Sequence, residues 1–120
     1  AVADAEENAR LNNIGNCRFI ADAAEHALPE LAELGIRPKA AVLDPPRAGC
    51  EPAVLQALLT MQPETIAYVS CDPATLARDL KILLADGKYR LGMVQPVDMF
   101  PRTGHVETII MMTNCGQDKK

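Results

Sequence analysis

Hydrophobic and polar positions along the chain alternate between strand-like and helical spacing, which predicts the order of its elements. Short apolar runs bounded by glycine, proline or polar residues predict strands at 17–21, 40–43, 65–69, 89–97 and 106–113. Apolar residues at helical spacing predict helices over 1–13, 23–34, 51–61 and 72–86. Helix and strand alternate before two strands follow in succession. The pattern therefore predicts an α/β fold with a mostly parallel sheet and an antiparallel last strand.

Composition indicates one folded domain. The chain has 120 residues, of which 48% are hydrophobic, which is enough for a single core. Its net charge of −4 gives no overall sign of nucleic-acid binding, although the acidic residues gather in the first third and most basic residues follow later. A local positive face is compatible with this balance.

The four cysteines and two histidines do not form a pattern that predicts a metal site. No C-x-x-C pair is present, and neither a zinc site nor a disulfide scaffold is indicated. Reduced thiols fit a cytoplasmic protein. No apolar run approaches the ~20 residues that a membrane span requires, so no membrane association is expected.

Cys71 lies where the predicted strand at 65–69 gives way to a helix. Pro73 suits the first helical position, and Asp72 suits the N-cap. Free backbone N–H groups and the helix dipole at such a junction favour a thiolate over a thiol, so Cys71 is a candidate nucleophile. A cysteine at a strand end can equally be a small packing residue. The junction alone leaves both interpretations open.

Two carboxylates are expected at the same edge of the sheet as Cys71. Asp44 follows the strand at 40–43, and the carboxyl ends of parallel strands form the ligand-binding edge of such sheets. If the last strand is antiparallel, its start at His105, Val106 and Glu107 lies at this edge too. A thiol and two carboxylates that are distant in sequence then share one rim, which favours a functional site.

Three segments carry a resemblance to a known family. They are Asp44-Pro45-Pro46-Arg47-Ala48-Gly49, Ser70-Cys71-Asp72-Pro73-Ala74-Thr75-Leu76-Ala77-Arg78-Asp79 and Asp98-Met99-Phe100-Pro101-Arg102-Thr103-Gly104-His105-Val106-Glu107. Their sequences, order and approximate spacing resemble the S-adenosylmethionine-dependent RNA uracil-5-methyltransferases, of the type that modifies 23S ribosomal RNA. The resemblance extends over essentially the whole chain. Asp72 departs from the family pattern, which more often has asparagine, and either residue can cap a helix.

The resemblance implies roles for four residues. It implies that Cys71 adds to C6 of uracil, so that C5 can attack the sulfonium methyl group of S-adenosylmethionine. Glu107 is then the base that removes the proton left on C5. Asp44 holds either the amino acid end of the cofactor or the uracil edge. Asp22 lies near the adenine, although a role as N-cap of the helix at 23–34 explains its position equally well.

Other polar residues near these segments have more modest expected roles. His105 supports the rim, while Arg47 contacts phosphate or pairs with an acidic residue. His26 is expected to be structural or solvated. The remaining cysteines, Cys17, Cys50 and Cys115, are interpreted as packing residues.

The sequence lacks parts that the resemblance leads one to expect. It has no glycine-rich loop and no acidic residue ending a second strand, so the cofactor site is incomplete. We therefore expect 1–114 to be the carboxyl-terminal part of a catalytic domain and 115–120 to be a frayed tail. Of the implied strand order 3-2-1-4-5-7-6, the chain would supply strands 3, 4, 5, 6 and 7. The strand at 40–43 would expose an edge, which the strand at 17–21 fills or which pairs edge to edge with a second copy.

Alternative functions remain open at this point. The substrate can be transfer RNA in place of ribosomal RNA. The chain can also be a stand-alone α/β cysteine hydrolase that uses Cys71 with His105, or a noncatalytic binding module. Reactivity of Cys71 toward a simple ester, without cofactor or RNA, would favour the hydrolase.

Overall fold

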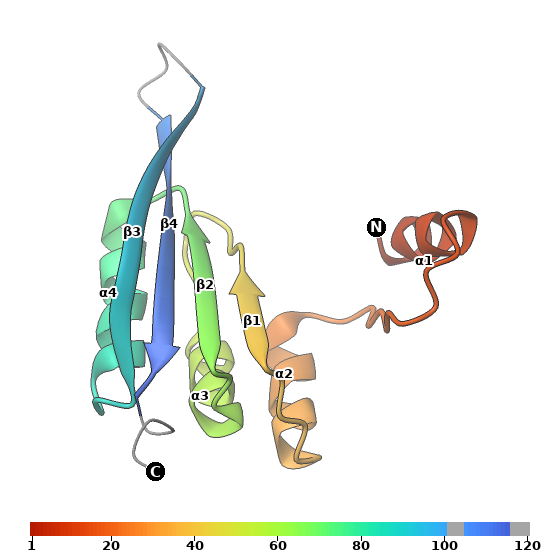
Figure 1. Ribbon diagram of the computed structural model, residues 1–120, viewed down its shortest axis with the longest axis horizontal. Coiled ribbons are helices and arrows are strands. Elements are labelled where there is room, and N and C mark those ends of the chain that lie inside the picture. The colour runs from red at the N-terminus through yellow and green to blue at the C-terminus, as the bar shows by residue number, and fades with distance from the viewer. Residues whose placement is uncertain (101–104, 116–120) are drawn as a thin grey trace.

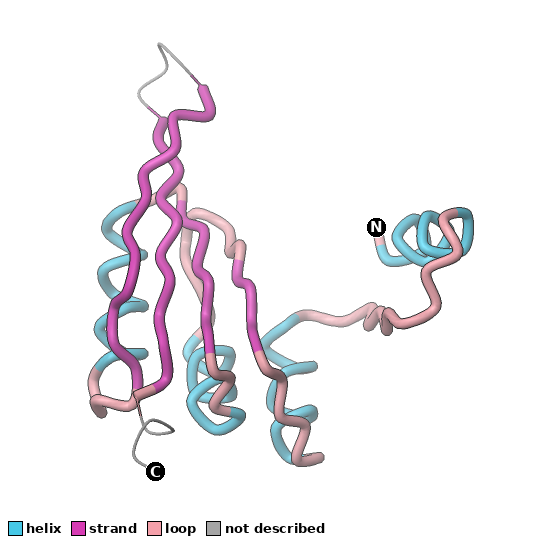
Figure 2. The backbone as a smooth tube through the Cα atoms, viewed as in Figure 1, coloured by secondary structure: helices cyan, strands magenta, loops and turns pink. Residues whose placement is uncertain are grey.

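The structure is a computed structural model that describes residues 1–100 and 105–115, with only the backbone described at 98–100 and 105–106. Its elements, shown in Figures 1 and 2, follow the predicted alternation. In chain order they are α1 (Val2–Leu11), α2 (Ala24–Glu33), β1 (Ala40–Leu43), α3 (Pro52–Met61), β2 (Thr65–Ser70), α4 (Pro73–Leu84), β3 (Tyr89–Phe100) and β4 (His105–Asn114).

The four strands form one mixed sheet in the order β1-β2-β4-β3. β1 and β2 are parallel, whereas β4 runs antiparallel to both of its neighbours, β2 and β3. The last strand of the chain is therefore inserted between β2 and β3, and it alone runs in the opposite direction. This arrangement confirms the predicted α/β fold with an antiparallel last strand.

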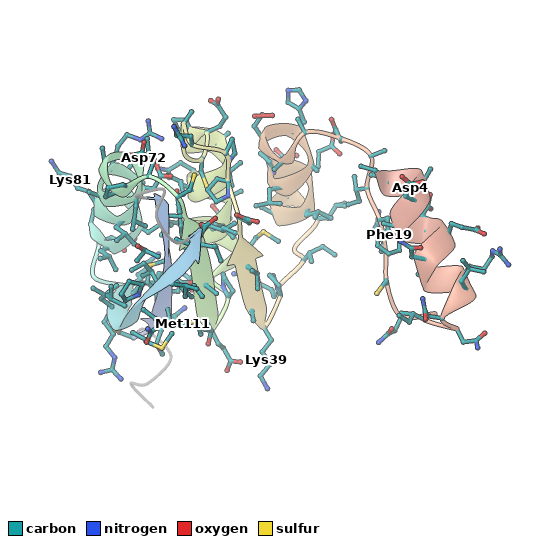
Figure 3. All side chains as sticks on the ribbon, turned by 90° about the horizontal axis from the view of Figure 1, so that it is seen from above. Asp4, Phe19, Lys39, Asp72, Lys81 and Met111 are labelled. Atoms are coloured by element: carbon teal, nitrogen blue, oxygen red, sulfur yellow. The ribbon has the colours of Figure 1, made fainter. Side chains whose placement is uncertain are left out.

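The predicted strand at 17–21 is wrong. These residues form no regular element in the structure, and they lie on the extended segment that leads from α1 toward α2 (Figures 1 and 3). Phe19 is only half-buried there, and Ile20 keeps 40% of its surface exposed. A short run of strand-forming residues is stable only when it pairs and packs, and this segment does neither.

The outer edge of β1 consequently has no strand beside it among the described residues. Val42, in the middle of β1, has 74% of its surface exposed. Unpaired N–H and C=O groups on such an edge can pair with another strand. Self-association of two copies through this edge therefore stays a prediction.

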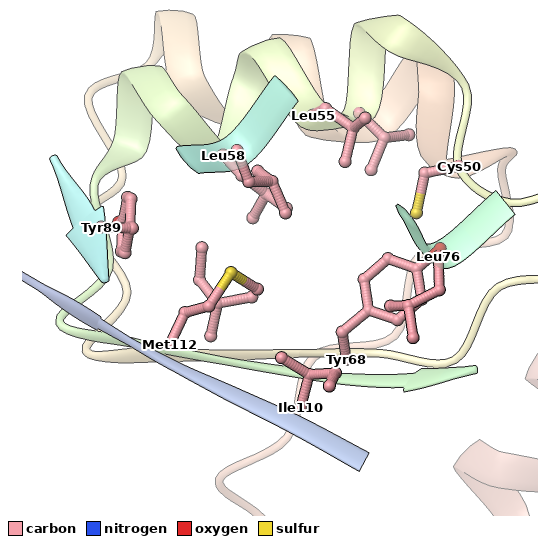
Figure 4. Close-up of a cluster of buried hydrophobic side chains, with 11 residues drawn as sticks. Cys50, Leu55, Leu58, Tyr68, Leu76, Tyr89, Ile110 and Met112 are labelled. Atoms are coloured by element: carbon pink, nitrogen blue, oxygen red, sulfur yellow. The ribbon is translucent and has the colours of Figure 1, made fainter. Parts of the chain in front are cut away.

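The core lies between the sheet and the helices α3 and α4, which cover the same face (Figures 1 and 4). Alternate residues of β2 and β4 point into it, as the period of two in a strand requires. The buried cluster contains Leu55 and Leu58 from α3, Leu76 and Leu83 from α4, and Ile66, Tyr68, Ile110 and Met112 from the sheet. These contacts fix the start of α4 against the end of β2.

Local sequence sets the ends of the two core helices. Pro52 and Pro73 occupy the first helical positions of α3 and α4, where the missing N–H costs nothing. Gln62 ends α3 in the left-handed conformation, with φ of 52°. Asp72 is the N-cap of α4, as the sequence predicted. Both helices thus begin at the same edge of the sheet, directly after the loops that carry the candidate site residues.

Candidate functional site

The strand register brings three of the four predicted site residues to one rim of the sheet. Leu43 of β1 pairs with Tyr68, and Ser70 of β2 pairs with Thr108 of β4. Asp44 and Cys71 therefore leave the ends of β1 and β2, while Glu107 enters β4 beside Cys71. Neighbouring strands lie ~4.8 Å apart, so Cys71 and Glu107 are adjacent, whereas Asp44 is level with Val69, two residues before Cys71 along the strand direction.

Hydrogen bonds on both sides of Cys71 fix its backbone. The Ser70 Oγ donates to the carbonyl of Asp72 at 2.9 Å and accepts from the Asp72 N–H at 3.1 Å. The Asp72 carboxylate accepts the N–H groups of Ala74 and Thr75 at 2.9 and 3.2 Å. Cys71 is half-buried, and its thiol is free. Because Asp72 occupies two of the helix N–H groups, those donors are not available to stabilise a thiolate.

One carboxylate oxygen of Glu107 is buried and has no hydrogen-bond partner among the described residues. The residue is half-buried, and its Oε2 is shielded from solvent without a hydrogen-bond partner in the described part of the chain. A buried carboxylate oxygen normally accepts at least one hydrogen bond, because leaving it unpaired costs free energy. This oxygen therefore has room for a hydrogen-bond donor, but as placed it is covered by protein rather than exposed to a bound molecule.

Asp44 lies at a pocket of about 440 Å³ between the end of β1, the following loop and the starts of α2 and α3. The walls combine apolar side chains, among them Leu28 and Val54, with the carboxylates of Glu25 and Glu51. An acidic pocket with apolar walls suits a ligand that joins positive charge to an apolar or aromatic group. Cys71 and Glu107 do not line this pocket, so they lie outside the cavity at Asp44.

Asp22 is not brought into the pocket. The N-cap of α2 is Ala23, with no side-chain capping bond, so the prediction of Asp22 as the N-cap is wrong. The Asp22 Oδ1 accepts the Ala23 N–H at 2.8 Å and lies 3.4 Å from Nδ1 of His26. The side chain of His26 is 70% exposed, as the solvated interpretation expected. Ala24, two residues further on, lines the pocket, whereas Asp22 does not.

A network that the sequence analysis missed holds the loop after Asp44. Asp79 of α4 is fully buried, and its Oδ2 accepts from the Cys50 N–H at 2.8 Å and from the Tyr68 hydroxyl at 2.5 Å. Its other oxygen accepts from the Arg78 guanidinium at 3.1 and 3.2 Å. The signal was present: Asp79 stands three residues after Leu76 and four before Leu83, on the buried face of the helix.

Burial and the Asp79 charge also raise the pKa values of two neighbours of this carboxylate. Burial, with the negative charge of Asp79, raises the pKa of the Cys50 thiol to about 11. Burial first, and the hydrogen bond to Asp79 second, raise the pKa of the Tyr68 phenol beyond its usual range. Both groups therefore stay protonated at neutral pH, and Cys50 is a packing residue rather than a nucleophile.

The remaining predicted residues have mixed outcomes. Cys17 is exposed, so its interpretation as a packing residue is wrong, while Cys115 is half-buried and all four cysteines are free thiols. Arg47 is exposed. Residues 101–104, the side chain of His105 and the tail at 116–120 lie outside the described residues, so the roles predicted there stay predictions.

Neither a metal site nor a membrane-spanning helix is found in the described part of the chain. It contains no group of three or more His, Cys, Asp or Glu side chains that could hold a metal ion. None of its helices has the length and apolar character needed to cross a membrane.

The fold is that of a known class of enzymes. The chain superposes on the crystal structure of a tRNA (uracil-54, C5)-methyltransferase from Pyrococcus abyssi in complex with S-adenosyl-L-homocysteine, with a TM-score of 0.76 and 32% identity. The match covers 93% of this chain and 26% of that protein. The sheet and its helices thus have the methyltransferase fold.

Sequence comparison narrows this class to a family. The chain belongs to the tRNA (uracil-5-)-methyltransferase family, whose model matches residues 1–115. It is 55% identical to an uncharacterized RNA methyltransferase of Clostridium tetani over all of its own length and 26% of the relative. It is 51% identical to another from Enterococcus faecalis, over 96% of this chain and 25% of that protein. The chain therefore spans about a quarter of the length of these relatives.

Proposed function

We propose that this chain is the carboxyl-terminal part of the catalytic domain of an S-adenosylmethionine-dependent RNA uracil-5-methyltransferase that acts in the cytoplasm. The observation that carries the proposal is the rim, where the strand register sets Cys71 between Asp44 and Glu107. Membership of the family supports the reaction class. The proposal assigns Cys71 and Glu107 to catalysis, and Asp44 and Asp22 to the cofactor side.

The pocket at Asp44 fits part of the cofactor. S-adenosylmethionine, when bound, supplies an electrophilic methyl group on a sulfonium, and its amino acid end carries a second positive charge. The carboxylates of Asp44, Glu25 and Glu51 complement positive charge, and the apolar walls suit a hydrophobic portion. Asp44 would hold the amino acid end or the uracil edge, while Asp22, two residues before Ala24 of the pocket wall, would lie toward the adenine.

Cys71 and Glu107 would perform complementary steps on the uracil ring. The thiolate of Cys71 adds to C6, which makes C5 electron-rich and able to take a methyl group. Glu107 then removes the proton from C5, and elimination of Cys71 restores the double bond between C5 and C6. The Oε2 of Glu107 has no hydrogen-bond partner in the described part of the chain, and the role of base requires the side chain to turn toward the uracil ring.

We infer 23S ribosomal RNA as the substrate from the segments around Asp44, Cys71 and Glu107. Transfer RNA is the second candidate, and the family description and the Pyrococcus abyssi neighbour favour it. Methylation of purified ribosomal and transfer RNA by the full-length protein, followed by mapping of 5-methyluridine, separates the two. A product in one RNA alone identifies the substrate class.

Covalent trapping tests the mechanism. RNA that contains 5-fluorouracil should form an adduct with the full-length protein that survives a denaturing gel, because C5 then carries fluorine in place of a removable proton. Cys71→Ser should abolish the adduct, whereas Cys17→Ser, at an exposed cysteine, should form it normally. An adduct formed equally well by Cys71→Ser would refute the assignment of the nucleophile.

Glu107→Gln tests the base separately. With ordinary RNA, this variant should accumulate the covalent complex, because Cys71 adds but the C5 proton stays in place. Glu64→Gln, at an exposed glutamate just before β2, is the matched control and should turn over as the wild type does. Loss of adduct formation in Glu107→Gln would instead place Glu107 before the addition step.

A further inference from the structure

The loop that carries Asp44 is pressed against α4 at Gly49. Gly49 has a φ of +84°, and a Cβ added there would lie 2.5 Å from the Arg78 Nη2, 2.9 Å from the Asp79 Oδ2 and 3.2 Å from the Thr75 Cβ. Contacts this close leave no room for a side chain. The backbone of the loop and the second turn of α4 therefore behave as one packed unit.

Three side chains of α4 bind the backbone of this loop. Asp79 accepts from the Cys50 N–H at 2.8 Å. The Arg78 Nη2 donates to the carbonyl of Ala48 at 2.8 Å, and the Thr75 hydroxyl donates to the carbonyl of Arg47 at 2.9 Å. Consecutive parts of the loop are thus attached to one helix face.

Asp79 is the centre of this arrangement. It is the only fully buried charged residue among the described residues, and four hydrogen bonds from three residues reach its carboxylate. Burying a charged side chain costs desolvation free energy, and an apolar side chain of similar size can often replace it without loss of stability. What an apolar residue cannot do is hold a backbone N–H and a tyrosine hydroxyl at fixed places.

We propose that Asp79 is a positioning residue that fixes the Asp44 loop relative to Cys71. The N-cap of α4, Asp72, is next to Cys71, and the second turn of α4 holds the loop that follows Asp44. One helix therefore positions both Cys71 and this loop. This inference rests on the proposed function, because it takes Asp44 as a ligand-binding residue and Cys71 as the nucleophile. Asp79 itself touches neither reactant.

The test is a double-mutant cycle in the full-length protein. Asp79→Asn keeps the size of the side chain but leaves one acceptor oxygen in place of two. The asparagine can therefore accept hydrogen bonds from Arg78, or from Cys50 and Tyr68, but not from both sets of donors. The substitution should lower kcat/KM for RNA methylation on the order of 10- to 100-fold, as a misplacement of about 1 Å does. In the Asp44→Asn background, Asp79→Asn should lower kcat/KM less than about threefold, because the effects of substitutions at residues that act through each other are not additive.

Tyr89→Phe is the control for a purely structural effect. It deletes another buried tyrosine hydroxyl, which donates to the carbonyl of Pro63 at 2.6 Å, far along the chain from the rim loops. This variant should lose stability and keep the wild-type kcat/KM. Alkylation of Cys71 by iodoacetamide should be unchanged in Asp79→Asn, since the turn around Cys71 is held by Ser70 and Asp72.

Hydrogen exchange supplies a readout that does not depend on turnover. The Cys50 amide should exchange at least tenfold faster than in the wild type in Asp79→Leu, which has no acceptor oxygen, and Tyr89→Phe should leave it unchanged. Fully additive effects of Asp44→Asn and Asp79→Asn, or a Cys50 amide that exchanges at the wild-type rate, would overturn the inference. A wild-type protein that forms no 5-methyluridine would overturn the proposed function instead, and exchange would still decide whether Asp79 holds the loop.

Discussion

Replacing Gly49 with alanine should destabilise the chain more than the same change at another glycine of similar conformation. Gly49 and Gly35 have φ angles of +84° and +79°. An added Cβ meets three atoms of α4 at Gly49 and nothing within 4 Å at Gly35. The pair therefore separates backbone strain from the close approach of the loop to α4.

The magnitude follows from three contributions. Alanine in the left-handed region costs about 1–2 kcal/mol at either position. The lower entropy of the unfolded alanine chain offsets roughly 0.4–1 kcal/mol of this. At Gly49 the Cβ also displaces Asp79 from the Cys50 N–H, and a hydrogen bond to a charged group contributes about 1.5–3 kcal/mol. We expect a loss of about 2–4 kcal/mol for Gly49→Ala and about 1 kcal/mol for Gly35→Ala.

Urea unfolding of the wild type and both variants measures this difference. Far-UV circular dichroism reports the helices, and tyrosine fluorescence reports the core, because both tyrosines, Tyr68 and Tyr89, are buried and the chain has no tryptophan. Equal slopes against urea are required for the comparison. Losses that agree within about 0.5 kcal/mol would show that the loop does not press on α4 as described.

Two further changes test the cap of α4 and the buried thiol. Asp72→Ala should lower the free energy of unfolding by about 1 kcal/mol, whereas Asp72→Asn, which keeps the cap, should be close to neutral in the same urea titration; equal losses would argue against capping. The raised pKa of Cys50, from 9.0 to about 11, means that the folded state binds more protons than the unfolded state in this interval. The Cys50 contribution to stability should therefore be intact below pH 9, and its loss should lower the free energy of unfolding by about 2–3 kcal/mol up to pH 11. Cys50→Ala should show a shallower fall over the same interval, and an unchanged slope would contradict the assignment.

The sequence predicted the sheet well because its strands are short apolar runs with clear ends. The strand at 40–43 was placed correctly to the residue, and that at 65–69 ended one residue early. Residues 17–21 have a similar composition but form no strand, because strand formation depends on a neighbouring strand that the local pattern does not specify. The prediction for β3 ended at 97, three residues short of Phe100, where β4 continues the pairing.

The candidate site was predictable only in part. Asp44 and Cys71 follow the ends of parallel strands, and Glu107 lies near the start of the antiparallel strand β4, so topology alone brought the three to one rim. The contacts of Asp79 depend on the rotation of α4 and on partners 11 and 29 residues away, which no local pattern specifies. An acidic residue on the leucine face of α4 could nevertheless have identified it as buried.

The two sides of the rim differ in the number of structural elements that support them. Cys71 and the Asp44 loop are both attached to α4, whereas Glu107 belongs to a pair of strands, β3 and β4, that continues past the end of β2 to the pairing of Phe100 with His105 (Figure 1). Two-stranded ribbons twist more than wider sheets, and a shift in register already interrupts this one between Val97 and Phe100. Glu107, the proposed base, thus belongs to the two-stranded part of the sheet, whereas Cys71, the proposed nucleophile, is attached to α4. Adjustment to a substrate would move the proton acceptor toward a fixed sulfur, and not the reverse.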